Sequence, residues 1–343
     1  MNLRFQELDA LRGLAAILVV FFHFTMFRPQ ADLGFIVGVT GVDLFFIISG
    51  FVIFMSLNGI KKPIEFVINR FTRLFPTYWA CAMLTFGLKF FFFNELAMSF
   101  KHFLVNLTML QHFFRIEGVD GTYWTMIIEL LFYFLMFFIL VFDKLKSTVL
   151  ICFFILMMIV FNDIILEKYF PFFKKIHFYM PLVSHFPMFF AGILFYKIIK
   201  IDAPNSRLIF VYYGLLIICF FVQLMLFYDG GRSNGFINFT TYLLMLFIYF
   251  FIFILLVNKK LKFLVNKSTL FLGKISFSLY LIHQFIGISM IDFFIDKKLF
   301  SFWTAFALAL FVVVLLATLI TFFIEIPVSK NWNARLKTFF IKQ

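Results

Sequence analysis

Apolar residues recur along the chain in long blocks that short polar breaks separate. About ten blocks approach or exceed the ~20 residues that a helix needs to cross a hydrocarbon core about 30 Å thick. They occupy residues 11–27, 37–57, 75–93, 124–142, 148–166, 181–199, 208–228, 237–257, 275–295 and 302–324. The pattern predicts an all-α integral membrane protein with about ten transmembrane helices.

The composition supports this fold class. Hydrophobic residues make up 64% of the 343 residues, and the mean hydropathy is +1.03. A soluble domain has only about 45–50% apolar residues and carries more charge. The longest predicted loop, 94–123, is too short for a second folded domain, so we expect one membrane domain over residues 1–343.

Basic residues set the expected orientation, because short cytoplasmic loops retain Lys and Arg. With the N-terminus inside, the basic residues divide about two to one in favour of the cytoplasmic loops. We therefore expect both termini in the cytoplasm and a multi-pass protein of the inner (cytoplasmic) cell membrane. Most of the net charge of +13 then lies on the cytoplasmic face, where it can attract anionic lipids and phosphate groups. The chain has no long basic run interleaved with aromatic residues, so nucleic-acid binding is not predicted.

Two ionisable residues, Arg12 and His23, lie inside the first apolar block. They are eleven positions apart, about three helical turns, so both side chains share one face, roughly 16 Å apart along the axis. Ionisable groups in a membrane span are costly and mark a functional site by default.

Two carboxylates are expected near the level of His23. With the second span descending, Asp43 falls in the outer third of the membrane, and Glu129 enters the fourth span at a similar height. A carboxylate beside an imidazole fixes its tautomer and raises its basicity, as a general base needs. The alternative is a polar cluster that only holds helices together.

Arg70 and Arg73 are three residues apart and share one face of a predicted short interfacial helix, which leads through Pro76 into the third span. Two guanidinium groups on one face can bind a phosphate in bidentate fashion. Ordinary anchoring of basic residues at the inner membrane surface is the alternative.

Ser276, Tyr280 and His283 occupy positions i, i+4 and i+7 of the ninth span and form one polar stripe. The alternative to a site is an interhelical hydrogen-bond seam. His185, in the sixth span, is a candidate for an acceptor cavity. Glu325, before Pro327, is expected to mark a helix end, and no metal-ligand spacing is found among histidines and carboxylates, so no metal is predicted.

Five stretches together resemble acyltransferase family 3, the membrane-bound acyltransferases typified by bacterial O-acetyltransferases of surface polysaccharides. They follow one another in the family's order over nearly the whole chain: residues 8–17 with His23, 41–51 around Asp43, 70–79 with Arg70 and Arg73, 123–129 with Trp124, Thr125 and Glu129, and 275–283 with Ser276, Tyr280 and His283.

The resemblance implies a ten-helix bundle that passes an acyl group from cytoplasmic acyl-CoA, such as acetyl-CoA, to a hydroxyl of a glycan or lipid-linked saccharide. Acyl-CoA is a co-substrate, and no bound cofactor is expected. The resemblance also implies that the chain lacks the extracytoplasmic esterase-like domain that some members carry.

The resemblance implies that His23 is the catalytic residue and that Arg70 and Arg73 hold the phosphates of coenzyme A, with Arg12 assigned to the same donor. From their estimated positions we expect Asp43 or Glu129 to orient the His23 ring, and Tyr280, His283 or Ser276 to donate to the oxyanion. Substrate binding is assigned to Trp124, Ser276 and His185.

Two other functions are compatible with buried ionisable residues. A secondary transporter would use Asp, Glu and His as a proton path, but it would also have broken helices at matching places in two halves, and the sequence has no such symmetry. A non-catalytic membrane scaffold would use the same polar groups as packing seams.

Overall fold

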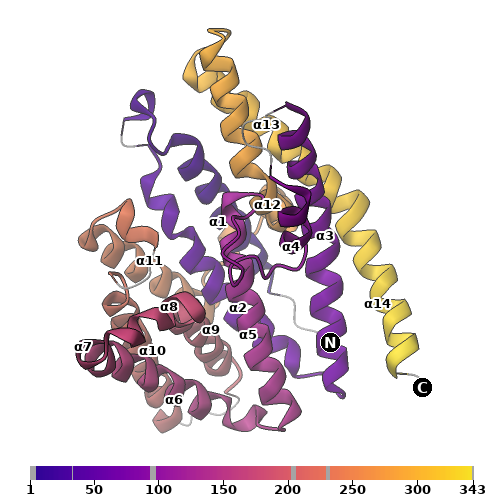
Figure 1. Ribbon diagram of the computed structural model, residues 1–343. Coiled ribbons are helices and arrows are strands. Elements are labelled where there is room, and N and C mark those ends of the chain that lie inside the picture. The colour runs from indigo at the N-terminus through magenta and orange to yellow at the C-terminus, as the bar shows by residue number, and fades with distance from the viewer. Residues whose placement is uncertain (1–4, 33, 93–97, 202–205, 229–231, 342–343) are drawn as a thin grey trace. The chain divides into compact units, whose positions relative to one another are not determined.

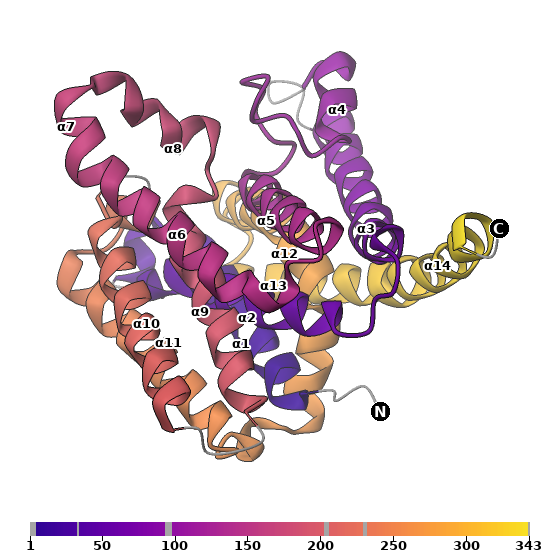
Figure 2. The same cartoon turned by 90° about the horizontal axis from the view of Figure 1, so that it is seen from below.

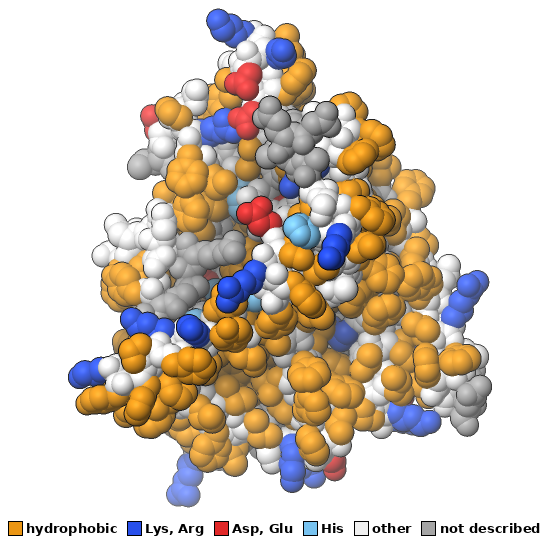
Figure 3. All heavy atoms as spheres, viewed as in Figure 1, with side chains coloured by type: hydrophobic (Ala, Val, Ile, Leu, Met, Phe, Trp, Pro, Cys, Tyr) orange, Lys and Arg blue, Asp and Glu red, His pale blue; other side chains and the backbone are white. Residues whose placement is uncertain are grey.

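The computed structural model describes residues 5–32, 34–92, 98–201, 206–228 and 232–341 (Figure 1). Within these ranges every regular element is a helix. Eight helices are long and apolar enough to cross a membrane, or nine if one bent pair counts as a single span. The predicted all-α membrane fold is therefore confirmed, and most side chains in the view of Figure 3 are hydrophobic.

The chain divides into two compact units, each built from separated stretches of sequence. The first unit comprises residues 1–38, 64–127 and 266–343, with helices α1 (Gln6–Thr25), most of α3 (Pro63–Phe92), α4 (Phe100–Asn106), α12 (Lys267–Asp296), α13 (Phe302–Ile320) and α14 (Ile326–Ile341). The second unit comprises residues 39–63 and 128–265, with α2 (Gly41–Leu57), most of α5 (Trp124–Val141), α6 (Thr148–Phe161), α7 (Glu167–Tyr169), α8 (Ile176–Tyr179), α9 (Phe186–Ile199), α10 (Ser206–Met225) and α11 (Phe239–Val257).

In the first unit α1 and α12 pack side by side and run parallel. Gly13 lies against Gly273, and ten residues further along each helix His23 lies against His283. A Cβ atom on Gly273 would come within 2.0 Å of the Asp9 carbonyl oxygen. Glycine is therefore required here, because the two backbones approach closely in the way that small residues permit in membranes.

The second unit contains a similar parallel pair, α2 and α9. A Cβ atom on Gly50 would lie 2.0 Å from the Phe189 carbonyl oxygen, and one on Gly192 would lie 2.1 Å from the Ile47 carbonyl oxygen. The absence of a Cβ at Gly50 and Gly192 thus lets α2 and α9 approach closely.

Two predicted helix boundaries are wrong. Pro76 does not separate an interfacial helix from a span, because α3 continues through it from Pro63 to Phe92. A proline inside a helix removes one backbone hydrogen bond. Membrane helices tolerate this because neighbouring groups and small local adjustments satisfy the freed carbonyl. Glu325 does not end the last span either: α13 continues through a wide π-helical turn, Thr321–Glu325, into α14. Pro327 follows this wide turn directly.

The chain also bends sharply just before the predicted sixth span, which itself is helical from Val183 to Ile199. After α6 the chain passes through a π-helical turn (Asn162–Leu166), α7 and α8, and then bends by 77° between Pro171–Tyr179 and Val183–Ile199. Figure 2 shows this segment of the second unit folding back on itself. Cys81, Cys152 and Cys219 are free and buried, as expected of core residues.

Candidate active site

The first unit brings together two histidines that are far apart in sequence. His283 Nε2 lies 3.1 Å from His23 Nδ1, and the two rings meet edge to face with centroids 4.9 Å apart. His283 is completely buried, whereas His23 is partly exposed. The buried ring therefore lies behind the accessible one.

The hydrogen-bond partners assign the tautomers of both rings. His283 Nδ1 lies 2.9 Å from the Tyr280 carbonyl oxygen and 3.1 Å from that of Leu279, so Nδ1 must carry the proton. His283 Nε2 is then an acceptor. His23 Nδ1–H donates to it and to the Val19 carbonyl oxygen at 2.9 Å. His23 Nε2 consequently presents its lone pair, which is the state that a general base or nucleophile requires.

Asp120 anchors the segment that precedes α5 to the helix bearing His283. Its Oδ2 accepts a hydrogen bond from the Phe285 N–H at 3.0 Å, and its Oδ1 accepts from the backbone and hydroxyl of Thr122, both at 3.0 Å. Asp120 is 1% exposed. Burial raises the pKa of its carboxyl group, and the hydrogen bonds from Thr122 and Phe285 oppose this rise. The carboxylate also interacts electrostatically with His23.

Tyr280, also on α12, lies beside His283. Its hydroxyl accepts a hydrogen bond from Thr125 Oγ1 at 3.1 Å, and its ring centroid lies 5.9 Å from that of His283. Ser276, by contrast, donates to the Gly273 carbonyl oxygen of its own helix. The predicted stripe is therefore buried on one helix, but only Tyr280 and His283 are found in the cluster around His23.

A second polar group of the first unit surrounds Glu325. Glu325 Oε2 accepts a hydrogen bond from Ser278 at 3.1 Å, and the carboxylate interacts electrostatically with Arg73 and Arg12. Arg73 is exposed on α3, and the Arg70 guanidinium lies 5.5 Å from the Phe66 ring centroid. Two of the three predicted arginines are thus close enough to Glu325 to interact with it electrostatically.

Three predicted site residues belong to the second unit. Asp43 Oδ1 lies 3.8 Å from His185 Nδ1, and the His185 ring packs on Phe46 with centroids 4.9 Å apart. Glu129 accepts a hydrogen bond from Tyr133 at 2.5 Å. Asp43 and His185 thus form a pair, and the roles of Asp43 and Glu129 beside His23 stay predictions. Trp124, the first residue of α5, is partly exposed, and its role in substrate binding also stays a prediction.

Sequence reasoning missed Asp120 and undervalued Glu325. Asp120 precedes Gly121 and Thr122 and caps a short helical turn, a pattern common in ordinary loops. Nothing local distinguishes it from a surface aspartate, because its burial depends on α12, more than 160 residues later.

Comparisons with known proteins bear on this site. A family model described as an acyltransferase domain matches residues 5–322. The "Exopolysaccharide production protein ExoZ" of Rhizobium meliloti (strain 1021) is 34% identical over 107 residues, which cover 29% of this chain and 33% of that protein. The chain thus aligns with only about a third of the length of this relative. No solved structure matches the chain.

Proposed function

The chain belongs to the acyltransferase family whose domain model spans residues 5–322, and on this basis we propose that it moves an acyl group from cytoplasmic acyl-CoA to a hydroxyl of a surface or exported glycan. The observation that carries the proposal is the His23 and His283 pair, in which Nε2 of a partly exposed ring keeps its lone pair. The membership favours acyl transfer over the transporter and scaffold alternatives.

The histidine pair suits acyl transfer to a hydroxyl. His23 Nε2 removes the hydroxyl proton, the oxygen attacks the thioester carbonyl, and the carbon–sulfur bond breaks. The leaving thiolate then takes the proton from the His23 imidazolium, which the His283 acceptor stabilises through Nδ1–H. Alternatively, Nε2 attacks first and forms an acyl-imidazole that the hydroxyl then cleaves. Both routes need the same tautomer.

Arginines support a coenzyme A donor. Arg70 and Arg73 lie on α3, and Arg12 lies on α1, the helix that carries His23. Guanidinium groups bind phosphates well, and the predicted orientation puts these arginines near the cytoplasmic end of their helices. The electrostatic interaction of Glu325 with Arg12 and Arg73 is consistent with a site that assembles several cations.

An acetyl group and an exported glycan are the proposed substrates. The similarity to an exopolysaccharide production protein supports a polysaccharide acceptor. The glycans of cells with and without the protein should differ in mass by one acetyl group, and the modified sugar identifies the acceptor. A glycan profile that is identical in both cell types contradicts the proposed acceptor class.

Purified protein and labelled acetyl-CoA test the catalytic assignment. We expect His23→Ala to abolish CoA release and any acyl-protein adduct, because it removes the nitrogen that reacts. The matched control is His102→Ala, which alters an exposed histidine of the same unit. If His23→Ala releases CoA at the wild-type rate, the assignment is wrong.

A further inference from the structure

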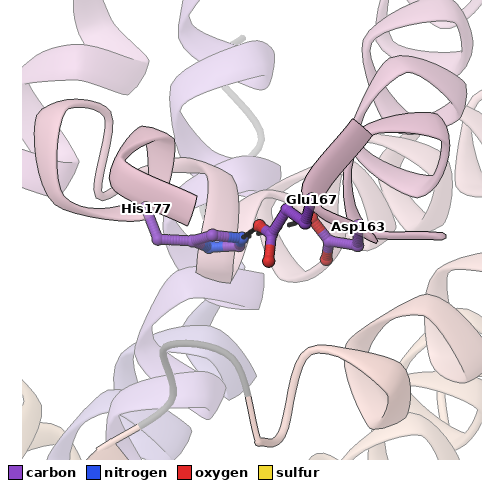
Figure 4. A group of neighbouring side chains, drawn as sticks. All are labelled: Asp163, Glu167 and His177. Atoms are coloured by element: carbon purple, nitrogen blue, oxygen red, sulfur yellow. Dashed lines mark hydrogen bonds and ion pairs between the residues drawn. The ribbon is translucent and has the colours of Figure 1, made fainter. Parts of the chain in front are cut away.

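An acidic and histidine cluster of three residues, none of them predicted from the sequence as a site residue, lies in the second unit (Figure 4). His177 Nε2 is 3.2 Å from Asp163 Oδ1 and 3.2 Å from Glu167 Oε1. The side chains of Asp163, Glu167 and His177 are 5%, 9% and 10% exposed. One ligand atom from each residue lies within 4.8 Å of the others.

The wide turn after α6 creates this arrangement. Asn162–Leu166 is π-helical, so the side chains of Asn162 and Glu167, five residues apart, come together. Asn162 Nδ2 donates to Asp163 Oδ1 at 3.0 Å and to Glu167 Oε1 at 3.1 Å. The chain then reverses through α7 and brings His177 of α8 onto the same two oxygens.

The hydrogen bonds around the cluster match those around a metal ion. A metal-bound histidine donates its other ring N–H to a fixed acceptor, and metal-bound carboxylates are held by further hydrogen bonds. Here His177 Nδ1 lies 2.9 Å from Ser184 Oγ, and Asn162 holds both carboxylates. Ligand bonds of about 2.1 Å put neighbouring ligand atoms about 3.0–3.4 Å apart. The two distances of 3.2 Å from His177 Nε2 to the carboxylate oxygens fall in this range.

Charge and unused acceptors also indicate a cation. Among the described residues only His177 comes within ion-pair distance of the two carboxylates. The nearby Lys168 and Lys175 instead lie over the rings of Tyr169 and Phe172, respectively. Asp163 Oδ2 and Asn162 Oδ1 are buried oxygens that accept no hydrogen bond from the described part of the chain. Two buried carboxylates beside one imidazole leave net negative charge even when that imidazole is protonated.

We propose that Asp163, Glu167 and His177 bind one divalent transition-metal ion, Zn²⁺ or Mn²⁺, and that Asn162 holds the two carboxylates in place through its Nδ2 hydrogen bonds. One imidazole nitrogen with carboxylate oxygens suits these ions, whereas Ca²⁺ and Mg²⁺ prefer sites made entirely of oxygen. The site goes beyond the proposed acyl transfer, because none of its residues belongs to the histidine pair.

The bound ion would fasten the bent segment of the second unit. It would join the end of α6 to α8, and His177 reaches Ser184 just beyond the 77° bend. The Ser184 carbonyl oxygen in turn accepts a hydrogen bond from Gln223 Nε2 on α10 at 3.2 Å. The same segment contributes Asn162, Phe173 and Ile176 to the wall of an apolar cavity of about 590 Å³. Metal loading should therefore stiffen this wall.

Metal content and melting temperature test the site. Full-length protein without a polyhistidine tag is stripped with a chelator in detergent and then titrated with Zn²⁺ or Mn²⁺. We expect one ion per chain by elemental analysis after desalting, and a melting temperature that rises with added Zn²⁺. The near-isosteric double variant Asp163→Asn/Glu167→Gln should lose the ion and the rise in melting temperature.

Matched controls separate this site from general metal affinity. Asp143→Asn and His112→Gln change a carboxylate and an imidazole outside the cluster and should keep one ion per chain. Monodispersity in size exclusion verifies that each variant is folded. The proposal is overturned if stripped wild-type protein binds no Zn²⁺ or Mn²⁺, if the double variant binds as much as the wild type, or if Ca²⁺ or Mg²⁺ displaces the bound ion at equal concentration.

Discussion

At the scale of residues, hydrogen bonding decides which groups can react. His23 on its own is an imidazole of undefined tautomer, and His283 defines it because the Leu279 and Tyr280 carbonyl oxygens hold the proton on His283 Nδ1. A residue that acts through another in this way positions the reactive group rather than touching the substrate. The expected consequence is an effect on turnover more than on binding.

His283→Phe keeps an aromatic ring in the buried position but removes the acceptor for His23 Nδ1–H. We expect kcat to fall by about 10²-fold with KM for acyl-CoA nearly unchanged, the scale seen when one oriented polar partner is lost. His283→Gln, which can accept a hydrogen bond, should recover part of the loss. Steady-state kinetics of both variants provide the check, and wild-type kcat in His283→Phe rules out the positioning role.

Arg70→Ala/Arg73→Ala should raise KM for acyl-CoA with little effect on kcat. Each lost charged hydrogen bond to a phosphate contributes about 1.5–3 kcal/mol, so a rise of at least tenfold is expected. Lys61→Ala/Lys62→Ala, two exposed basic residues just before α3, provides the matched control. An unchanged KM in the arginine variant would leave those residues only an anchoring role.

At the scale of elements, glycine positions determine which helices meet. The block pattern predicts the helices themselves, because about 20 apolar residues must cross the hydrocarbon core. It does not predict that α1 pairs with α12, since the contact depends on the absence of a Cβ at Gly273 and Gly13. The helix boundaries at Pro76 and Glu325 were mispredicted for a related reason: packing of neighbouring helices overrides local breaking signals.

Gly273→Val should separate α1 from α12, because any Cβ would clash with the Asp9 carbonyl oxygen. Overpacking of this kind costs about 1–3 kcal/mol, so the melting temperature should fall, and activity should fall with it because the histidine pair lies on the same two helices. Gly87→Ala, where nothing lies within 4 Å of the added Cβ, is the control in the same unit. Equal melting temperatures and activities in both variants contradict the packing argument.

At the scale of the whole molecule, the chain forms two compact units, and each contains its own parallel helix pair with ionisable groups. The first unit has His23 and His283, and the second has Asp43 and His185. The basic residues predict that both termini face the cytoplasm. This orientation decides on which side the acyl donor and the acceptor meet the protein.

Cysteine labelling of cells tests the orientation. Lys297→Cys should react with an impermeant maleimide in intact cells, whereas Lys260→Cys should react only after the membrane is opened. Both positions are exposed, and the three native cysteines are buried, so background labelling should be low. The reverse pattern requires the opposite orientation.

The sequence by itself determined the membrane fold, the helical segments and the resemblance to an acyltransferase family, because hydropathy and short motifs are local properties of the chain. Tertiary structure decided which polar groups meet. His23 and His283 are 260 residues apart, Asp120 reaches Phe285, and Asp163 and Glu167 meet His177 only after a reversal of the chain. Such contacts depend on close helix packing and on wide turns, which the spacing of residues along one helix does not specify.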